Sequence, residues 1–83
     1  MKILYFAWLR QRTGIGEEEI TLPPEIDDVA ALIGWLKRRG PKFAEALADT
    51  SAIRIAVDQE FAALDTTLAG AKEVALFPPM TGG

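Results

Sequence analysis

Strand-like and helix-like patterns of apolar and polar residues alternate along the chain. Residues 2–9 are apolar at both odd and even positions, which predicts a first strand that is central in a sheet and covered on both faces. The segment 10–16 contains Gly14 and Gly16, and we expect it to be a loop. Further strands are predicted from short apolar or alternating runs at 17–22, 52–57, 61–64 and 72–77.

One helix is predicted after the second strand. Its apolar stripe has the spacing i, i+3, i+4 and i+7 and consists of Val29, Leu32, Ile33 and Leu36. Asp27 or Asp28 can cap its start. Gly40 can take the left-handed position after its end, and Pro41 prevents the helix from continuing. The basic residues 37–39 would either compensate the helix dipole, which we favour, or bind a phosphate.

The order of these elements predicts an α+β fold. A hairpin, a crossover helix and further strands fit together when the first and last strands lie side by side in parallel. The result is a β-grasp arrangement, in which a mixed sheet of four or five strands carries one main helix packed on one face. We assign residues 1–78 to this domain and residues 79–83 to an extended C-terminal tail.

Composition excludes several classes of function. With 83 residues and a hydrophobic share of 49%, the chain is long enough for one compact core. It has no Cys and no His, so thiolate chemistry and the commonest general base are excluded, and we predict no metal site. The absence of Cys suits a reducing cytoplasm, where we expect the protein to act. A net charge of −3 disfavours a nucleic-acid partner, and the apolar runs are too short for a membrane partner.

The carboxylates at 17–19 are the one dense acidic cluster. They could indicate acid–base or metal chemistry. The interpretation that we favour is a solvated edge strand, protected by its charge against pairing with other chains.

The last seven residues, Phe77-Pro78-Pro79-Met80-Thr81-Gly82-Gly83, have the composition of a presented arm. The two prolines hold its base extended and prevent the sheet from continuing. Gly-Gly adds little to a fold but gives a slender end without Cβ atoms. We expect Gly83 to be the natural C-terminus, so that its α-carboxylate stands on an arm reaching roughly 15 Å.

Two stretches resemble a known family. They are Tyr5-Phe6-Ala7-x-Leu9-Arg10 followed by Gly14, and Leu68-x-Gly70-x-x-Glu73-Val74-Ala75-Leu76-Phe77-Pro78-Pro79-Met80-Thr81-Gly82-Gly83. Together with the order of elements, they resemble the molybdopterin synthase small subunit, a sulfur-carrier family with a ubiquitin-like fold. The departures are Ala71-Lys72 in place of the family's Gly-Asp turn, and Met80 where the family often has Val.

The resemblance implies a carrier without catalytic side chains of its own, which binds no cofactor. Gly83 would be adenylated by a ubiquitin-activating-like adenylyltransferase that uses ATP, and would then become a thiocarboxylate. The tail with Thr81 and Gly82 would enter the large synthase subunit and donate sulfur to a cyclic pyranopterin, forming the dithiolene of molybdopterin.

A docking face is predicted from strand parity. If Ile3, Tyr5, Val74 and Leu76 face the helix, then Leu4, Phe6, Trp8 and Phe77 form an apolar patch on the other face. Residues 42–48, which can add a helical turn or two, or a loop could instead cover part of this patch. We add the root of the tail to the partner-binding set, namely Pro78, Pro79 and Met80. Arg10 could pair with an acidic partner group or be solvated.

Other functions remain open from the sequence. The same tail chemistry serves ubiquitin-like sulfur carriers for thiamin or tRNA thiolation and protein modifiers joined to lysines. The ending Phe-Pro-Pro-Met-Thr favours the molybdopterin branch. A small hydrolase has no support, because neither a phosphate loop nor a nucleophile–base set is found. An interaction module with an inert tail would tolerate the removal of Gly83.

Overall fold

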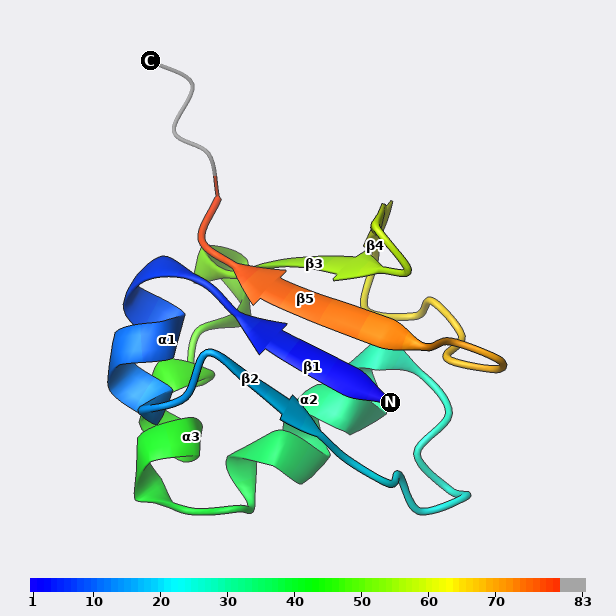
Figure 1. The fold of residues 1–83 in the computed structure, drawn as a ribbon, viewed down its shortest axis with the longest axis horizontal. Coiled ribbons are helices and arrows are strands. Elements are labelled where there is room, and N and C mark those ends of the chain that lie inside the picture. The colour runs from blue at the N-terminus through cyan, green and yellow to red at the C-terminus, as the bar shows by residue number, and fades with distance from the viewer. Residues whose placement is uncertain (80–83) are drawn as a thin grey trace.

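The computed structural model describes residues 1–79. Along the chain, these residues form a five-stranded sheet, three α-helices and one 3₁₀-helix (Figure 1). In order, the elements are β1 Lys2–Tyr5, α1 Ala7–Thr13, β2 Glu17–Glu19, α2 Val29–Lys37, α3 Pro41–Ala46, η1 Thr50–Ala52, β3 Arg54–Val57, β4 Glu60–Ala62 and β5 Glu73–Phe77.

The first and last strands pair in parallel at the centre of the sheet. The strand order is β2-β1-β5-β3-β4, and every neighbouring pair except β1–β5 is antiparallel. The register aligns Ile3 with Val74 and Tyr5 with Leu76. The predicted α+β class and β-grasp arrangement are therefore confirmed.

The hydrophobic core lies between one face of the sheet and the helices. Ile3, Tyr5, Val74 and Leu76 point into it, as their parity predicted, and each is at most 1% exposed. The whole predicted stripe of α2 is buried against them, and α2 crosses behind the sheet in Figure 1. Leu9 of α1 and Leu47 after α3 complete the core. This burial is the main stabilising term, at about 25 cal/mol per Å² of apolar surface.

The ends of α2 resolve the choice between the two aspartates. The Asp28 Oδ1 atom accepts a hydrogen bond of 2.8 Å from the Ala31 N–H, so Asp28 is the N-cap. The prediction for Gly40 is wrong, because Arg38 is the C-cap of α2 and is right-handed. Gly40 instead precedes α3 as its N-cap with φ of 155°, and Pro41 opens α3 at a position where no N–H is needed.

The first predicted strand is too long. In the structure, β1 ends at Tyr5. The end of the predicted strand and the start of the predicted loop instead form α1. Ala7, with φ of 52°, turns the chain after Phe6. Gly14, with φ of 84°, ends the helix by donating its N–H to the Arg10 carbonyl. A short apolar run has the same appearance in a buried strand and in one buried turn of helix, so periodicity could not separate them.

The other strands are shorter than predicted, and η1 occupies the start of the segment expected at 52–57. Asp58 and Gln59 both have positive φ, as a two-residue hairpin between β3 and β4 requires. The Asp58 Oδ1 atom also accepts hydrogen bonds from the N–H groups of Lys72 (2.9 Å) and Glu73 (3.0 Å). This contact ties the hairpin to the start of β5.

Replacing the cap tests the assignment of the α2 start. We expect Asp28→Ala to lower the free energy of unfolding by about 1 kcal/mol, because the Ala31 N–H loses its acceptor. The exposed neighbour Asp27 has no side-chain role in the cap, so Asp27→Ala should change stability by less than about 0.5 kcal/mol. Urea unfolding followed by circular dichroism measures both, and equal losses would contradict the assignment.

Candidate functional site

The face of the sheet that points away from the helices carries an apolar surface. The registers place Leu4, Ala75, Ala56 and Phe61 in one row across four strands. In the next row towards the tail, Phe77 is aligned with Arg54, and Phe6 donates its N–H to the Leu76 carbonyl at 3.1 Å. Because the two alanines are small, the larger side chains around them remain accessible. Phe6 is 48% exposed and Phe61 is 83% exposed.

We define the apolar patch as Leu4, Phe6, Phe61, Phe77, Pro78 and Pro79. It includes the last residue of β5 and the two prolines that follow it, and Figure 1 shows where the chain leaves this strand. The rings of Phe61 and Phe77 are 6.0 Å apart between centroids, in a tilted arrangement typical of aromatic pairs. A charged row closes the other end of the face, where Lys2 is aligned with Glu19 on one side and Glu73 on the other.

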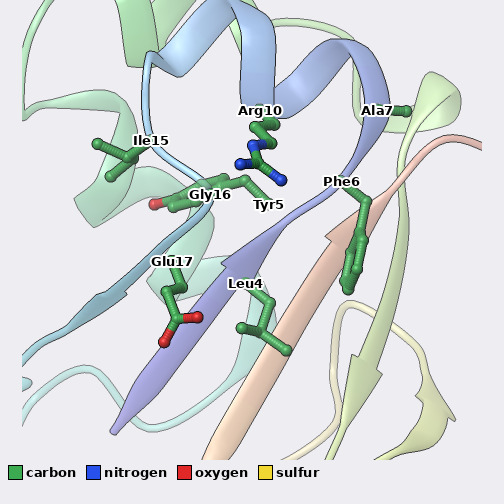
Figure 2. A pocket seen from close by; sticks show the side chains of 8 residues that line it. All are labelled: Leu4, Tyr5, Phe6, Ala7, Arg10, Ile15, Gly16 and Glu17. Atoms are coloured by element: carbon green, nitrogen blue, oxygen red, sulfur yellow. The ribbon is translucent and has the colours of Figure 1, made fainter.

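A hollow of about 450 Å³ lies on the β1–β2 side of the patch (Figure 2). Leu4 and Phe6 line it together with Arg10 of α1 and Glu17 of β2. A Cβ atom on Gly16 would lie only 3.1 Å from the Arg10 guanidinium carbon. A larger residue at this position would therefore displace the flexible end of the Arg10 side chain.

A second hollow of about 420 Å³ lies on the β3–β4 side. It is lined by Arg54, Phe61, Ala62, Phe77 and Pro79. Phe61 was missing from the predicted docking residues. The sequence shows only an aromatic residue in a short predicted strand. The face of the sheet on which Phe61 lies depends on the hairpin at 58–59, and the type of that hairpin was not predicted.

The structure brings together most of the predicted docking residues but not Trp8. Leu4, Phe6, Phe77, Pro78 and Pro79 all belong to the patch. Trp8 lies on α1 rather than on the sheet, because the strand ends before it. Its ring lies under the Arg12 guanidinium at 4.8 Å, beside Glu45 and Ala46 of α3. Residues 42–48 line neither hollow of the patch, so Trp8 is absent from it because of α1 and not because these residues cover it.

The predicted reactive end lies outside the described residues. The residues outside the described part are Met80, Thr81, Gly82 and Gly83. Their proposed roles remain predictions.

A family model, described as ThiS family, matches residues 3–83. The chain belongs to the ThiS family. It is 30% identical over 83 residues to the molybdopterin synthase sulfur carrier subunit of Haemophilus influenzae, covering 100% of this chain and 99% of that one. The Escherichia coli protein of the same name is 34% identical over 83 residues, with the same coverage. The resemblance found in the sequence is thereby confirmed.

Solved structures agree with this membership. SAMP1 from Haloferax volcanii superimposes with a TM-score of 0.72 at 26% identity, covering 100% of this chain and 98% of that one. The putative molybdopterin converting factor, subunit 1, from Pyrococcus furiosus has a TM-score of 0.72 at 36% identity, covering 95% of each chain.

In this ThiS-family chain, the carboxylates at 17–19 have structural roles. β2 is an edge strand, as expected. Glu17 contacts Lys2 at 3.7 Å, and Glu19 contacts the Met1 ammonium group at 2.8 Å. Within residues 1–79, no three potential metal ligands of the Asp, Glu, His or Cys type come together. None of the helices described there is long and apolar enough to cross a membrane.

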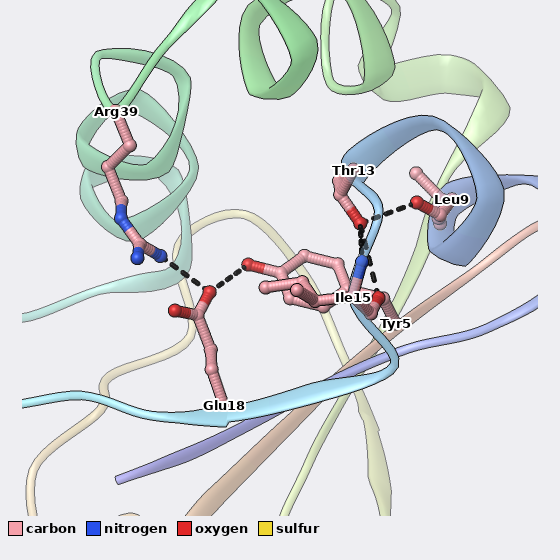
Figure 3. Close-up of polar contacts among 6 residues, drawn as sticks. All are labelled: Tyr5, Leu9, Thr13, Ile15, Glu18 and Arg39. Atoms are coloured by element: carbon pink, nitrogen blue, oxygen red, sulfur yellow. Dashed lines mark hydrogen bonds and ion pairs between the residues drawn. The ribbon is translucent and has the colours of Figure 1, made fainter.

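Glu18 differs from its neighbours because it faces the helices. Its Oε2 atom accepts hydrogen bonds from the Tyr5 hydroxyl (2.7 Å) and from Arg39 Nη1 (2.5 Å), as Figure 3 shows. The Arg39 guanidinium lies over the rings of Phe43 (4.9 Å) and Trp35 (5.5 Å). Arg39 therefore holds β2 to the helical layer, a role that neither interpretation of residues 37–39 included.

The pKa shifts in this group follow from burial and charge. Burial raises the pKa of the Tyr5 hydroxyl, and the hydrogen bond to Glu18 raises it further. Burial also acts to raise the pKa of Glu18, but the hydrogen bonds from Arg39 and Tyr5 outweigh it, so the net shift is downward. The ionised carboxylate is thus the form that the fold stabilises.

This shift predicts an acid-sensitive contribution to stability. A depressed carboxyl pKa stabilises the fold above its unfolded value of about 4.3, and the contribution is lost as the pH falls through the lower folded value. We expect Glu18→Gln to cost about 1–2 kcal/mol at pH 7, with the difference from the wild type shrinking below about pH 4. Urea unfolding across this pH range measures it.

Glu17→Gln is the matched control for that measurement. The Glu17 side chain is 64% exposed, so its loss should change stability by less than about 0.5 kcal/mol. A Glu18 variant whose deficit stays constant from pH 7 to pH 3 would contradict a role for the charge.

Proposed function

We propose that this chain is the sulfur-carrier small subunit of a molybdopterin synthase. The observation that carries the proposal is its similarity, over the full chain, to relatives named as such carriers. The apolar patch supports it independently, because the patch includes Phe77, Pro78 and Pro79, from which the segment ending in Gly82-Gly83 continues. A partner that covers the patch would receive that segment at the same time.

The proposed chemistry takes place at the Gly83 carboxylate. A carboxylate is a poor electrophile, so an adenylyltransferase related to ubiquitin-activating enzymes would join it to AMP from ATP, releasing pyrophosphate. A sulfur donor at the oxidation level of sulfide would then displace AMP and leave a thiocarboxylate. The thiocarboxylate sulfur is itself a nucleophile and needs no neighbouring base, in keeping with a chain that has no His and no Cys.

The small subunit would then act as a reagent and a docking module. It would bind no cofactor of its own, with ATP consumed on the activating partner. The large subunit would supply the catalytic side chains and the pyranopterin site. Two carriers, each bearing a thiocarboxylate, would be used for each dithiolene. We place this reaction in the cytoplasm, where the lack of cysteines is no disadvantage.

Three alternative functions would use the same chemistry at the tail. They are sulfur carriers for thiamin, sulfur carriers for tRNA thiolation and protein modifiers. The molybdopterin branch is favoured because the relatives from Haemophilus influenzae and Escherichia coli carry its name. Co-purification with a pterin-binding large subunit separates this branch from the other carriers.

Intact mass tests the carrier chemistry. After incubation with ATP, the cognate adenylyltransferase and a sulfur donor, we expect the full chain to gain about 16 Da, as oxygen is replaced by sulfur at Gly83. A variant lacking Gly83 should gain nothing. A wild-type chain without the gain, or a gain located elsewhere by fragmentation, would contradict the proposal.

Binding to the large subunit tests the patch. We expect Phe61→Asp and Phe77→Ala each to weaken the complex about 30-fold or more, because exposed aromatic anchors dominate such interfaces. Leu64→Asp is the control, since Leu64 is 46% exposed but lines neither hollow of the patch. Calorimetric titration should give it nearly wild-type affinity. If all three variants bind equally well, the docking face is elsewhere.

A further inference from the structure

Arg54 occupies a position that the proposed function does not yet explain. It is the first residue of β3 and is aligned with Phe77, the last residue of β5. It is exposed and lines the β3–β4 hollow with Phe61 and Pro79. A cationic side chain therefore stands beside the apolar patch and the root of the tail.

Within residues 1–79, the Arg54 guanidinium is held by neutral carbonyl groups and contacts no carboxylate. Its Nη1 atom donates to the carbonyl oxygens of Ser51 and Ile53, each at 3.2 Å. These bonds use one nitrogen, whereas an arginine side chain has five N–H donors on three nitrogens. The ion pairs found within residues 1–79 involve Met1, Lys2 and Arg39, and none involves Arg54.

Two other cations lie near this face, Arg10 beside the β1–β2 hollow and Lys2 in register on the sheet, and Lys2 is arranged differently from Arg54. Lys2 belongs to the charged row at the far end and contacts Glu17 at 3.7 Å. Its ammonium group therefore already has a carboxylate nearby within the chain, although both side chains are solvated. Arg54 lies in the row nearest the tail, where its neighbour in register is aromatic.

Covering the patch would make this unpaired charge costly. A partner that packs on Phe61 and Phe77 also removes water from the hollow that Arg54 lines. Desolvation without a counter-charge would oppose docking, whereas a carboxylate placed there would meet a pre-oriented fork of donors in a medium of low polarity. Arginine is accordingly one of the commonest residues to dominate interface energies.

We propose that Arg54 determines partner specificity by pairing with an Asp or Glu carboxylate of the synthase large subunit when that subunit covers the apolar patch. This inference rests on the proposed function and specifies the chemistry of its docking partner. A surface with apolar contacts but no carboxylate at this point would be rejected, because it would bury the guanidinium unpaired.

Charge reversal with a matched control tests this inference. Using the full chain and the purified large subunit, we expect Arg54→Glu to weaken binding about 30-fold or more. Arg54→Lys keeps the charge but not the planar fork, and it should weaken binding several-fold. Arg38→Glu makes the same change of charge at the exposed end of α2 and should bind within about twofold of the wild type. Thermal unfolding verifies that each variant is folded.

Rescue then identifies the partner residue. Each Asp and Glu on the large subunit is replaced singly by Arg, and each variant is tested against both the Arg54→Glu chain and the wild-type chain. We expect one of these variants to bind the Arg54→Glu chain better than the wild-type chain. The inference is overturned if Arg54→Glu binds as the wild type does, if Arg38→Glu weakens binding equally, or if no reversed pair restores affinity. Failure of the proposed function has a different signature, in which the wild-type chain neither gains sulfur at Gly83 nor binds the large subunit.

Discussion

The parallel pairing of β1 with β5 is the constraint on which the rest of the structure depends. It joins residues from the two ends of the domain at the centre of the sheet, with Ile3 beside Val74 and Tyr5 beside Leu76. Because parallel strands point the same way, the end of β5 lies level with the turn into α1. The last described residues therefore leave the domain beside Phe6 and Phe77. The point at which Pro78 and Pro79 follow the sheet is thus fixed by the most central contact of the fold.

Successive side chains of these strands point to opposite faces of the sheet, and the two faces have different environments. Those facing the helices are buried and stabilise the domain, whereas those facing outward form the apolar patch. The central alanines, Ala56 and Ala75, keep the outward face shallow. The aromatic groups around them are then accessible to a partner. One short sheet thereby contributes one face to the core and exposes the apolar patch on the other.

Charge is distributed in keeping with this division. Glu18 is ionised on the helix side, where Arg39 and Tyr5 satisfy it and fasten the edge strand. On the outward face, Lys2 has the carboxylate of Glu17 nearby. Arg54 alone among the cations in register on that face has no carboxylate contact within the described chain. Among the described residues, the charge that fastens β2 is paired internally, and the charge of Arg54 is the one that the proposed partner would meet.

The sequence by itself determined the α+β class, the stripe of α2, the parity of β1 and β5 and the Gly-Gly ending, because each depends on local period or composition. Only the tertiary structure decided where β1 ends, since Ala7 and Gly14 turn an apolar run into a helix that removes Trp8 from the sheet face. It also decided that Phe61 belongs to the patch and that Arg54 lies beside it. The same holds for Glu18, which is hydrogen-bonded to Tyr5 instead of being solvated like its neighbours. Those placements depend on registers between strands far apart in the chain. No local pattern encodes such registers, because they are set by the packing of the whole domain.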